Sequence, residues 1–434
     1  MDAYSKTLER IYNVRGGVID LRLDRMDRAL ALFDHPEKRF PSFHIAGTNG
    51  KGSTAAMLHR ILSLAGYRTA LYTSPHLVSF TERIRIADEE IAPEEVVALA
   101  DEIWDRSDSA NISLTFFEIV TVMAFIYFAR RQADVAVVEV GLGGRLDATN
   151  LVNPVVSVIT TISKDHEFFL GSDLTSIARE KGGIIKQGVP VVCGDLPAEA
   201  TAEIREIARI HAAPFYKLKQ NFISTLKIDG AFDYKGANWN FEDLSIGLRG
   251  RHQRMNAAIA VAALEITREQ FKVGETAIRA GLQSVSWPGR MEVMLKEPTV
   301  ILDGAHNGEG IKALIDEIRD LRSAGRIKLL FAAMEDKDWR HMLSGLAGVI
   351  DEIVLTRVSG MERSTDPNQL AEVVVGKLPH RVIPDSRSAL EFLIENALST
   401  DIIVIAGSLY LLGDVRPRVE AIARRKQSGK GSLN

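Results

Sequence analysis

The chain has 434 residues, of which 46% are hydrophobic and 25% are charged, and its formal net charge is −4. This composition is that of an ordinary globular protein, and the length leaves room for two or three domains, each with its own core. The slight acidic excess argues against nucleic acid as the main partner.

Segments that would indicate a membrane or an oxidising compartment are not evident. Residues 1–10 are polar and lack the apolar core of a signal peptide, and the longest apolar stretch, residues 119–129, is too short to span a bilayer. We interpret that stretch as a buried helix. The single cysteine, Cys193, is expected to be a buried apolar residue and suits the cytoplasm. The basic, Gly/Ser-containing tail 424–434 is expected to be poorly ordered.

Short apolar runs alternate with helical patterns along the first part of the chain. Continuous apolar strands separated by helices are typical of a parallel sheet covered on both faces. The candidate strands are residues 43–46, 69–72, 135–140, 155–160 and 189–193. Residues 221–248 alternate in polarity and carry glycine turn signals at 229–230 and 235–236, which predicts antiparallel hairpins, and a helix at 255–266 follows.

Pro288, Gly289 and Arg290 interrupt this pattern and predict a hinge. Beyond the hinge we expect a second series with strands 299–302, 328–332, 352–355 and 402–405 and helices 310–321 and 386–397. The fold class is therefore α/β. We predict a P-loop parallel-sheet ATPase domain at residues 1–290 and a smaller Rossmann-like, doubly wound C-terminal domain at residues 297–434.

The strongest motif is a glycine-rich turn between the first strand and a helical pattern. Glycines let successive N–H groups face an anion, and the helix N-terminus adds the positive end of its dipole. Lys51 supplies a charge for terminal phosphates, although Gly52 stands where Ser or Thr usually follows the lysine. A plain strand–helix turn is the alternative. The predicted nucleotide-binding residues are Gly47, Thr48, Asn49, Gly50, Lys51, Gly52 and Ser53.

Polar residues also lie at or just beyond the ends of two other predicted strands. Glu139 lies near the end of a buried strand, where a carboxylate is costly unless it is paired or binds a metal. Asp165 and His166 follow the next strand and so reach the same edge of the sheet. We favour Mg²⁺ coordination by Glu139, with His166 as a second ligand or an acid/base group. A carboxylate satisfied by a helix N-terminus and a structural histidine are the alternatives.

Lys181 comes at the end of a helical pattern, where a lysine usually remains solvated and offsets the helix dipole. Beside two metal ligands it could instead be carbamylated, which turns the cation into a metal-binding anion.

In the second domain, Asp303 and His306 lie on a turn between a strand and a helix and could bind ribose or phosphate. Ser408 and Tyr410 follow the last strand in the same way, and Arg290 is placed to reach a phosphate when the domains close. Cap or turn roles are the alternatives.

Taken together, these segments resemble the folylpolyglutamate synthase/dihydrofolate synthase branch of the Mur ligase superfamily. The resemblance covers nearly the whole chain, in order and in spacing. The segments that carry it are residues 47–53, 73–77, 141–150, 165–166, 180–186, 250–253, 256–257, 288–290, 303–307 and 407–410.

The resemblance implies that Ser74, Glu139 and His166 bind Mg²⁺, with the carboxylate bridging two ions, and that a carbamylated Lys181 holds the second ion. It implies Lys51, Lys181 and His166 as catalytic residues. ATP would be held by the phosphate loop together with Asn256, Arg290, Asp303 and His306. Lys164 departs from the family pattern, because an uncharged residue is expected before Asp165.

The resemblance also assigns the other substrates. Segment 74–85, with Pro75, His76 and Arg83, is similar to the family's folate-contacting loop. Thr115, Phe116 and Asp147 would lie around the pterin–aminobenzoate part, although Asp147 could simply cap the turn before Asn150. The incoming glutamate would lie near Ser408 and Tyr410.

The implied activity is ATP-dependent joining of L-glutamate to a substrate carboxylate through an acyl phosphate, with domain closure excluding water. Segments 20–26 and 144–150 are more similar to those of bifunctional bacterial enzymes than to those of enzymes that only extend the glutamate chain. Both dihydropteroate and reduced folates are therefore expected acceptors. The alternatives are a folylpolyglutamate synthase alone, another Mur-type amino-acid ligase (which segment 74–85 argues against), or a nucleotide-sensing interaction protein. We expect a cytoplasmic monomer without nucleic-acid or membrane partners.

Overall fold

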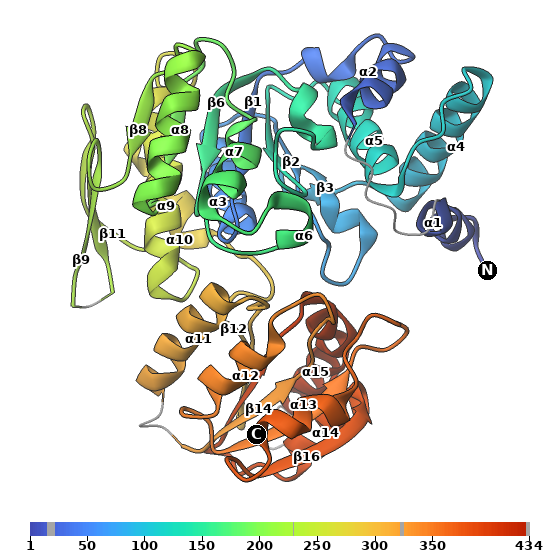
Figure 1. The fold of residues 1–434 in the computed structure, drawn as a ribbon, viewed down its shortest axis with the longest axis vertical. Coiled ribbons are helices and arrows are strands. Elements are labelled where there is room, and N and C mark those ends of the chain that lie inside the picture. The colour runs from blue at the N-terminus through green and yellow to red at the C-terminus, as the bar shows by residue number, and fades with distance from the viewer. Residues whose placement is uncertain (15–21, 229, 322–324, 431–434) are drawn as a thin grey trace. The chain divides into compact units, whose positions relative to one another are not determined.

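The computed structural model describes residues 1–14, 22–228, 230–321 and 325–430, and side chains as far as residue 426 (Figure 1). Its backbone contacts divide the chain into two compact units. Unit 1 comprises residues 1–247 and 253–285, and unit 2 comprises residues 248–252 and 286–434. The domain boundaries at residues 290 and 297 stay a prediction, and the hinge segment 288–290 lies in unit 2.

Unit 1 is built on an eight-stranded sheet with the order β4-β3-β2-β5-β1-β6-β7-β8. The six strands from β2 to β8 in this order run parallel, and β3 and β4 add an antiparallel edge. The strands are β1 Ser42–Ala46, β2 Thr69–Tyr72, β3 Ile84–Ile86, β4 Glu89–Glu90, β5 Val135–Glu139, β6 Pro154–Ile159, β7 Val191–Cys193 and β8 Phe215–Lys217. The predicted parallel sheet is thus present.

The connections between parallel strands decide which helix covers which face of this sheet. Right-handed crossovers place α3 on one face and α5, α7 and α8 on the other. The helices are α1 Ala3–Asn13, α2 Leu23–Ala31, α3 Lys51–Leu64, α4 Pro93–Ser109, α5 Phe116–Arg130, α6 Glu167–Leu170, α7 Leu174–Gly182, α8 Ala198–Ile210, α9 Arg251–Ile266 and α10 Glu275–Ser284, with 3₁₀ turns η2 Pro36–Lys38, η3 Phe80–Arg83 and η4 Ala148–Leu151.

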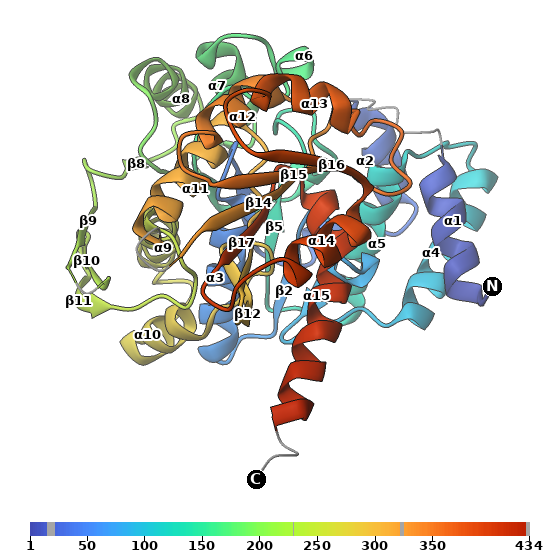
Figure 2. The same cartoon turned by 90° about the horizontal axis from the view of Figure 1, so that it is seen from below.

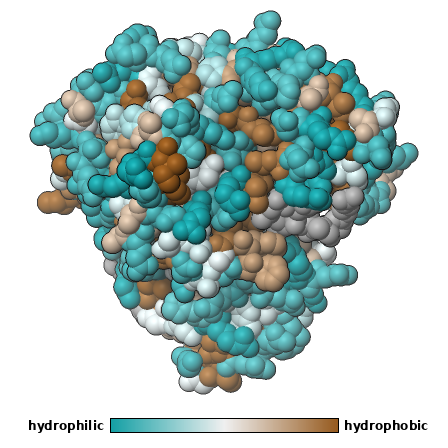
Figure 3. All heavy atoms as spheres, turned by 45° about the horizontal axis from the view of Figure 1, so that its top comes forward, coloured by the Kyte–Doolittle hydropathy of each residue, from teal (hydrophilic) through white to brown (hydrophobic). Residues whose placement is uncertain are grey.

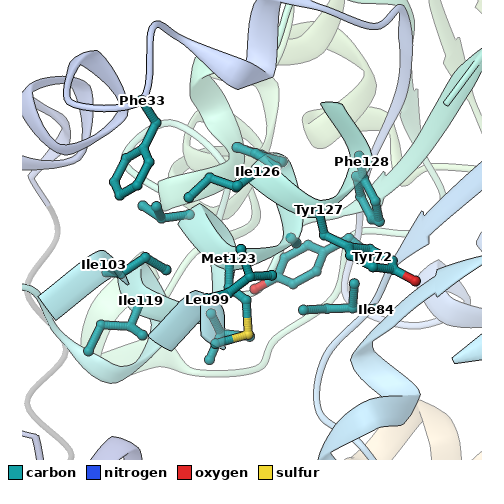
Figure 4. Close-up of a cluster of buried hydrophobic side chains, with 14 of the residues drawn as sticks. Phe33, Tyr72, Ile84, Leu99, Ile103, Ile119, Met123, Ile126, Tyr127 and Phe128 are labelled. Carbon is teal, nitrogen blue, oxygen red and sulfur yellow. The ribbon is translucent and has the colours of Figure 1, made fainter. Parts of the chain in front are cut away.

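Helix α5 is the centre of the largest core in unit 1. Its residues 118–128 are all buried, as predicted for the apolar stretch, because the helix is covered by the sheet and by neighbouring helices. Side chains of α4 and α5 meet Tyr72 of β2 and Ile84 of β3 in this core (Figure 4). The helix begins with a capping box between Thr115 and Glu118, which satisfies backbone N–H groups of its first turn.

A small antiparallel sheet with the order β11-β10-β9 confirms the predicted hairpins. Its strands are β9 Ile223–Leu226, β10 Phe232–Lys235 and β11 Asn240–Leu244. It is held to α9 by Glu265, whose carboxylate accepts hydrogen bonds from the Tyr234 hydroxyl at 2.5 Å and the Trp239 N–H at 2.9 Å. Asp229, in one of the predicted turns, lies outside the described residues.

Unit 2 is a doubly wound domain, as predicted, with the strand order β12-β13-β17-β14-β15-β16. Only β12 is antiparallel to its neighbour in the described part of this sheet. Helices α11 to α13 cover one face, and α14 and α15 cover the other (Figure 2). The elements are β12 Glu292–Lys296, β13 Thr299–Leu302, α11 Gly308–Leu321, β14 Ile327–Phe331, α12 Trp339–Leu346, β15 Glu352–Arg357, α13 Pro367–Val374, β16 His380–Asp385, α14 Ser386–Glu395, β17 Ile402–Ala406 and α15 Leu409–Lys430.

The tail from residue 424, which we expect to be poorly ordered, begins inside α15, and this helix continues to Lys430. Arg424 pairs with Glu420 one turn earlier, and the Lys426 ammonium donates to the carbonyl of Glu297, so both contacts favour the helix. Residues 431–434 lie outside the described residues.

The surface and the single cysteine agree with the composition. On the face shown in Figure 3, most of the surface is hydrophilic and apolar side chains form small separate groups. None of the helices among the described residues is both long and apolar enough to cross a bilayer. Cys193 is fully buried at the end of β7, as expected, and burial raises the pKa of its thiol.

Candidate active site

The glycine-rich loop follows β1 at the carboxyl edge of the sheet in unit 1. Because β1 lies between β5 and β6, groups that follow three neighbouring strands meet at this edge. Helix α3 begins directly after Gly50, whose φ of 85° is a left-handed conformation that favours glycine. A Cβ atom at Gly47 would lie 1.9 Å from Oγ1 of Thr160, so the close packing of the loop excludes a larger residue there.

Lys51 is the first residue of α3, and its side chain folds back over the loop. Its Nζ donates hydrogen bonds to the carbonyl oxygens of Gly47 at 2.9 Å and Thr48 at 3.2 Å. The long, flexible stem of a lysine allows the ammonium to exchange such carbonyl oxygens for phosphate oxygens. The next residues, Gly52 and Ser53, are buried in the first turn of α3.

The residues directly after β6 hold this loop in place. The N–H of Thr48 donates to the carbonyl of Thr161 at 2.8 Å, and the N–H of Asn49 donates to Oγ1 of Thr161 at 2.9 Å. Oγ1 of Thr160 donates to the carbonyl of Asn49 at 2.7 Å, and the N–H of Ser163 donates to Oγ1 of Thr48 at 3.0 Å. The sequence analysis missed these contacts, although two threonines at the end of a predicted strand were a usable signal.

Glu139 is the last residue of β5 and is almost fully buried. It lies in register with Ile45 of β1, one residue before the end of that strand. The N–H of Ser74, which follows β2, donates to Oε2 of Glu139 at 3.2 Å. Two of the predicted metal ligands are therefore neighbours, and both offer oxygen atoms, which Mg²⁺ prefers.

Lys181 lies at the end of α7 and is buried, so it is not a solvated lysine that merely offsets the helix dipole. Its Nζ donates to the carbonyl of Gly47 at 3.0 Å, the same carbonyl that accepts from Lys51. Burial and the neighbouring Lys51 ammonium lower the pKa of Lys181 to about 7. The predicted catalytic lysines thus meet at the phosphate loop.

His166 lies at the start of α6 and is held in a left-handed conformation with a φ of 50°. Its N–H donates to Oδ1 of Asp165 at 2.9 Å, and its Nε2 lies 3.9 Å from the same oxygen. The side chain is 38% exposed, which leaves the imidazole accessible to a ligand. Lys164, the departure from the family pattern, is also exposed.

The donor set fits a hard cation that arrives with a nucleotide. The described residues contain no group of three or more His, Cys, Asp or Glu side chains that could hold a metal by themselves. Glu139 and Ser74 offer only part of an oxygen shell, and Mg²⁺ in nucleotide sites is usually bound by one or two carboxylates plus phosphates and waters.

Asn256 of α9 lies against the phosphate loop. A Cβ atom at Gly50 would come within 2.5 Å of its Oδ1, and its Nδ2 donates to Oε1 of Gln253 at 3.0 Å. Gln253 is fully buried, and its Nε2 has no hydrogen-bond partner among the described residues. Leaving a buried donor unpaired is costly, so a ligand atom that accepts this bond would stabilise the site. The sequence analysis did not assign Gln253.

Three of the residues predicted to contact folate, His76, Arg83 and Phe116, form a cluster near the start of α5. Nε of Arg83 donates to Nδ1 of His76 at 2.8 Å, and the Arg83 guanidinium lies 5.3 Å from the ring centre of Phe116. Phe116 stacks on Tyr12, an unpredicted member, with ring centres 5.5 Å apart. Partial burial and the charge of Arg83 lower the pKa of His76 to about 4, so the imidazole is neutral. Pro75 is exposed beside His76.

Thr115 and Asp147 have clear structural roles. Thr115 caps α5, and Asp147 caps η4 by accepting a hydrogen bond from the N–H of Thr149 at 3.0 Å. The other Asp147 oxygen accepts from the N–H of Leu142 at 2.8 Å, and burial raises the pKa of this carboxyl. These contacts support the capping alternative for Asp147, while its part in folate binding stays a prediction.

In unit 2, Asp303 connects the turn after β13 to the hinge segment. Its Oδ2 accepts from the N–H of Met291 at 3.0 Å, and its Oδ1 accepts from the N–H of Ala305 at 3.0 Å. Burial raises the pKa of Asp303, and the Arg290 guanidinium opposes this shift. A Cβ atom at Gly304 would lie 2.0 Å from Nη1 of Arg290, so the guanidinium packs directly on the turn.

The two predicted turns of unit 2 are neighbours. The N–H of Gly407 donates to the carbonyl of Ala305 at 2.9 Å. Nδ1 of His306 lies 2.8 Å from the carbonyl of Gly304, which makes Nδ1 the protonated nitrogen. Oγ of Ser408 accepts from the N–H of Tyr410 at 3.2 Å, and Tyr410 is 37% exposed. Arg290, Asp303, His306 and Ser408 are thus brought to one edge of this sheet.

A phosphate loop at the carboxyl edge of a parallel sheet, together with a doubly wound second unit, defines the class of nucleotide-dependent α/β enzymes. Within this class, two family models match the chain. The Mur ligase middle domain matches residues 45–264, and the Mur ligase glutamate ligase domain matches residues 289–409.

Known proteins match over nearly the full length. The dihydrofolate synthase/folylpolyglutamate synthase of Bacillus subtilis is 36% identical over 92% of this chain and 95% of its own. Escherichia coli FolC, solved in complex with DHPP and ADP, is 33% identical, with a TM-score of 0.89 over 96% of this chain and 98% of its own. The bifunctional enzyme of Yersinia pestis, solved with AMPPNP and Mn ion, is 32% identical, with a TM-score of 0.86 over the same shares.

The chain therefore belongs to the dihydrofolate synthase/folylpolyglutamate synthase family of Mur ligases, which are ATP-dependent glutamate ligases.

Proposed function

We propose that this ligase is bifunctional and adds L-glutamate both to dihydropteroate and to reduced folates. One observation carries the proposal. A phosphate loop whose Gly47 carbonyl accepts from both Lys51 and Lys181, with Glu139 at the end of the neighbouring strand, occurs in a chain that is 36% identical, over 92% of its length, to a relative with both names. The Arg83–Phe116 cluster near the start of α5 supports an acceptor with an aromatic ring system.

The reaction proceeds in two steps. The acceptor carboxylate attacks the γ-phosphorus of ATP, and the bond between this phosphorus and the oxygen that bridges it to the β-phosphate breaks. ADP is released, and the acceptor becomes an acyl phosphate. The α-amine of L-glutamate then attacks the acyl carbon, phosphate departs and the amine proton is released. In the first step the loop N–H groups and the Lys51 ammonium bind the transferring phosphate oxygens and stabilise the charge that develops on them.

We propose Mg–ATP as the nucleotide substrate, with two ions in the site. The Y. pestis relative was solved with AMPPNP and Mn ion, which supports the use of a divalent cation. Ser74, Glu139 and His166 would hold the ions, together with phosphate oxygens. When bound, Mg²⁺ supplies neutralisation of the phosphate charge. Asn256, Arg290, Asp303 and His306 are proposed to bind the rest of the nucleotide.

We further propose that Lys181 is carbamylated in the active enzyme. A buried ammonium beside Lys51 is unfavourable, whereas a carbamate at the same position would pair with a cation. The family resemblance and the burial of Nζ support this modification, and the neutral amine is the form that adds carbon dioxide.

The acceptor and glutamate sites follow the same resemblance. Pro75, His76, Arg83, Thr115, Phe116 and Asp147 are proposed to surround the folate, and Ser408 and Tyr410 to contact glutamate. We also keep residues 1–290 and 297–434 as the proposed domains, which limited proteolysis between residues 286 and 297 would test. A monomer in the cytoplasm is proposed, and the single buried cysteine supports a reducing compartment.

A parallel assay tests the function. The purified protein is given ATP, Mg²⁺ and L-glutamate, with either dihydropteroate or tetrahydrofolate, and both phosphate release and the glutamylated product are measured. We expect turnover of both acceptors and none by Lys51→Ala. If the protein extends tetrahydrofolate but does not use dihydropteroate, it is a folylpolyglutamate synthase alone and the bifunctional proposal is wrong. Nucleotide binding without turnover of either acceptor would overturn the ligase assignment and favour the nucleotide-sensing alternative.

A further inference from the structure

A buried ion pair connects helix α2 to the first turn of α5. Nε of Arg25 donates to Oε1 and Oε2 of Glu118 at 3.0 and 2.9 Å, and its Nη2 donates to Oε1 at 2.8 Å. The side chains are only 11% and 4% exposed, although the two residues are 93 positions apart in the sequence. Planar, bidentate pairing of this kind fixes orientation as well as distance.

The same carboxylate also organises the start of α5. Oε2 of Glu118 accepts hydrogen bonds from the N–H of Thr115 at 2.7 Å and from its Oγ1 at 2.9 Å. A capping box consists of reciprocal hydrogen bonds between the cap residue and the residue three positions later, and it needs no cation. Here Arg25 compensates the charge, so the turn that presents Thr115 and Phe116 is fixed relative to α2.

Stability alone is a weak reason for such a pair. Removing two charges from water is costly, and apolar residues of similar volume often stabilise a core equally well. Apolar residues could have filled these two positions, because Met26 and Leu30 of α2 pack in the same apolar core as Ile119 of α5. What the ion pair adds is a defined geometry.

That geometry matters at the next residue. Phe116 follows Thr115 directly, stacks on Tyr12 at 5.5 Å and lies beneath the Arg83 guanidinium at 5.3 Å. A rotation of the first turn of α5 would move the Phe116 ring away from both partners. We propose that Arg25 is a positioning residue for the acceptor, and that it acts through Glu118 to set Thr115 and Phe116 against the pterin-bearing end.

This inference rests on the proposed function, because it takes the Phe116 cluster as part of the acceptor site. It predicts a selective effect. Dihydropteroate lacks the glutamyl carboxylates that give a reduced folate additional contacts, so its binding depends more on the pterin end. ATP does not contact this cluster in the proposed site.

The test compares conservative variants at both members of the pair. Arg25→Lys keeps the charge but loses the planar fork, and Glu118→Gln keeps an acceptor for Thr115 but loses the charge. We expect KM for dihydropteroate to rise about tenfold in each, with a smaller rise for tetrahydrofolate and little change in kcat or in KM for ATP. Arg130→Gln is the matched control, because it removes the Arg130–Glu102 pair of 2.7 Å at the other end of α5.

A double variant keeps the test decisive if a single variant does not fold. Arg25→Leu with Glu118→Gln leaves no unpaired buried charge and retains the cap, and we expect it to fold and still show the raised KM. An unchanged KM for dihydropteroate, or an equal loss in every kinetic constant, would overturn the positioning role. Failure of the wild-type protein to use any acceptor would instead overturn the proposed function.

Discussion

Lys181 shows how one buried side chain can decide the chemistry of a site. Its amine lies beside the Lys51 ammonium and donates to the same carbonyl of Gly47, so in its unmodified form it brings two cations together. Burial and this repulsion lower the pKa of Lys181 to about 7, which leaves a large share of neutral amine near neutral pH. The residue is therefore suited to modification in a way that a solvated lysine is not.

We expect a carbamate on Lys181 that Lys181→Ala abolishes together with turnover. The protein would be equilibrated with ¹³C-bicarbonate and Mg–ATP, and the carbamate carbon detected by NMR. Short carboxylic acids should restore part of the activity of Lys181→Ala, because they replace the missing anion. The matched control is Lys186→Met, since Lys186 is partly shielded from solvent and its Nζ donates to the carbonyl of Asn150 at 2.7 Å. A carbamate signal that persists without Lys181 would refute the assignment.

Helix α3 carries a left-handed glycine beyond each end, and only one of them borders the site. Gly50 has a φ of 85° and Gly66 a φ of 95°. A Cβ at Gly50 would meet Asn256 at 2.5 Å, whereas a Cβ at Gly66 would have nothing within 4 Å. A side chain at either position would be strained by the left-handed backbone. Only the side chain at Gly50 would also displace a neighbour, which is Asn256.

Alanine substitution at the two glycines should therefore separate strain from function. We expect each variant to lose about 1–2 kcal/mol of unfolding free energy, the cost of a left-handed non-glycine residue. Gly50→Ala should in addition lose ATP binding, measured by calorimetry, because it pushes Asn256 away from the loop. Gly66→Ala should bind ATP like the wild type. Equal ATP affinities in the two variants would show that Asn256 does not act at this site.

At the scale of elements, the sequence predicted the interior strands better than the edges. Strands β2 and β13 match their predicted bounds because continuous apolar runs such as residues 69–72 are buried on both faces. The edge strands β4 and β16 were missed because Glu89–Glu90 and most of His380–Asp385 are exposed and give no apolar signal. Edge strands are stabilised by hydrogen bonds to the neighbouring strand, and the apolar pattern of the sequence does not reveal this pairing.

The site divides in the same way. Glu139 and His166 could be placed at one sheet edge because Glu139 lies near the end of one predicted strand and His166 follows another. The capping box of Thr115 and Glu118 is also visible as a local spacing. The pairing of Arg25 with Glu118 could not be predicted, because it depends on how α2 packs on α5 across 93 positions of sequence. A local motif such as the capping box can be recognised in the sequence, whereas a distant partner such as Arg25 is known only from the tertiary structure.

At the scale of the whole molecule, unit 1 buries two neutral histidines, His44 and His59, in addition to the neutral His76 of the cluster with Arg83 and Phe116. Burial lowers the pKa of His44 to about 3 and that of His59 to about 4, against an ordinary value of 6.5. His44 contacts Oγ1 of Thr149 at 2.9 Å, and His59 lies within α3. Between these lowered values and pH 6.5 the unfolded chain binds protons that the folded chain does not. These two histidines therefore make stability rise with pH across this window and fall on acidification.

Acidification from pH 7 to pH 5 should accordingly destabilise the protein before most carboxylates titrate. Each histidine should lower the free energy of unfolding by about 1.4 kcal/mol per pH unit once the pH is well below 6.5. Urea unfolding followed by circular dichroism at several pH values would measure this slope. His59→Gln removes one titrating group while keeping a polar side chain. The slope of its unfolding free energy against pH should therefore be smaller by about 1.4 kcal/mol per pH unit, which corresponds to one proton. Identical slopes in the wild type and His59→Gln would show that His59 is not held neutral in the folded protein.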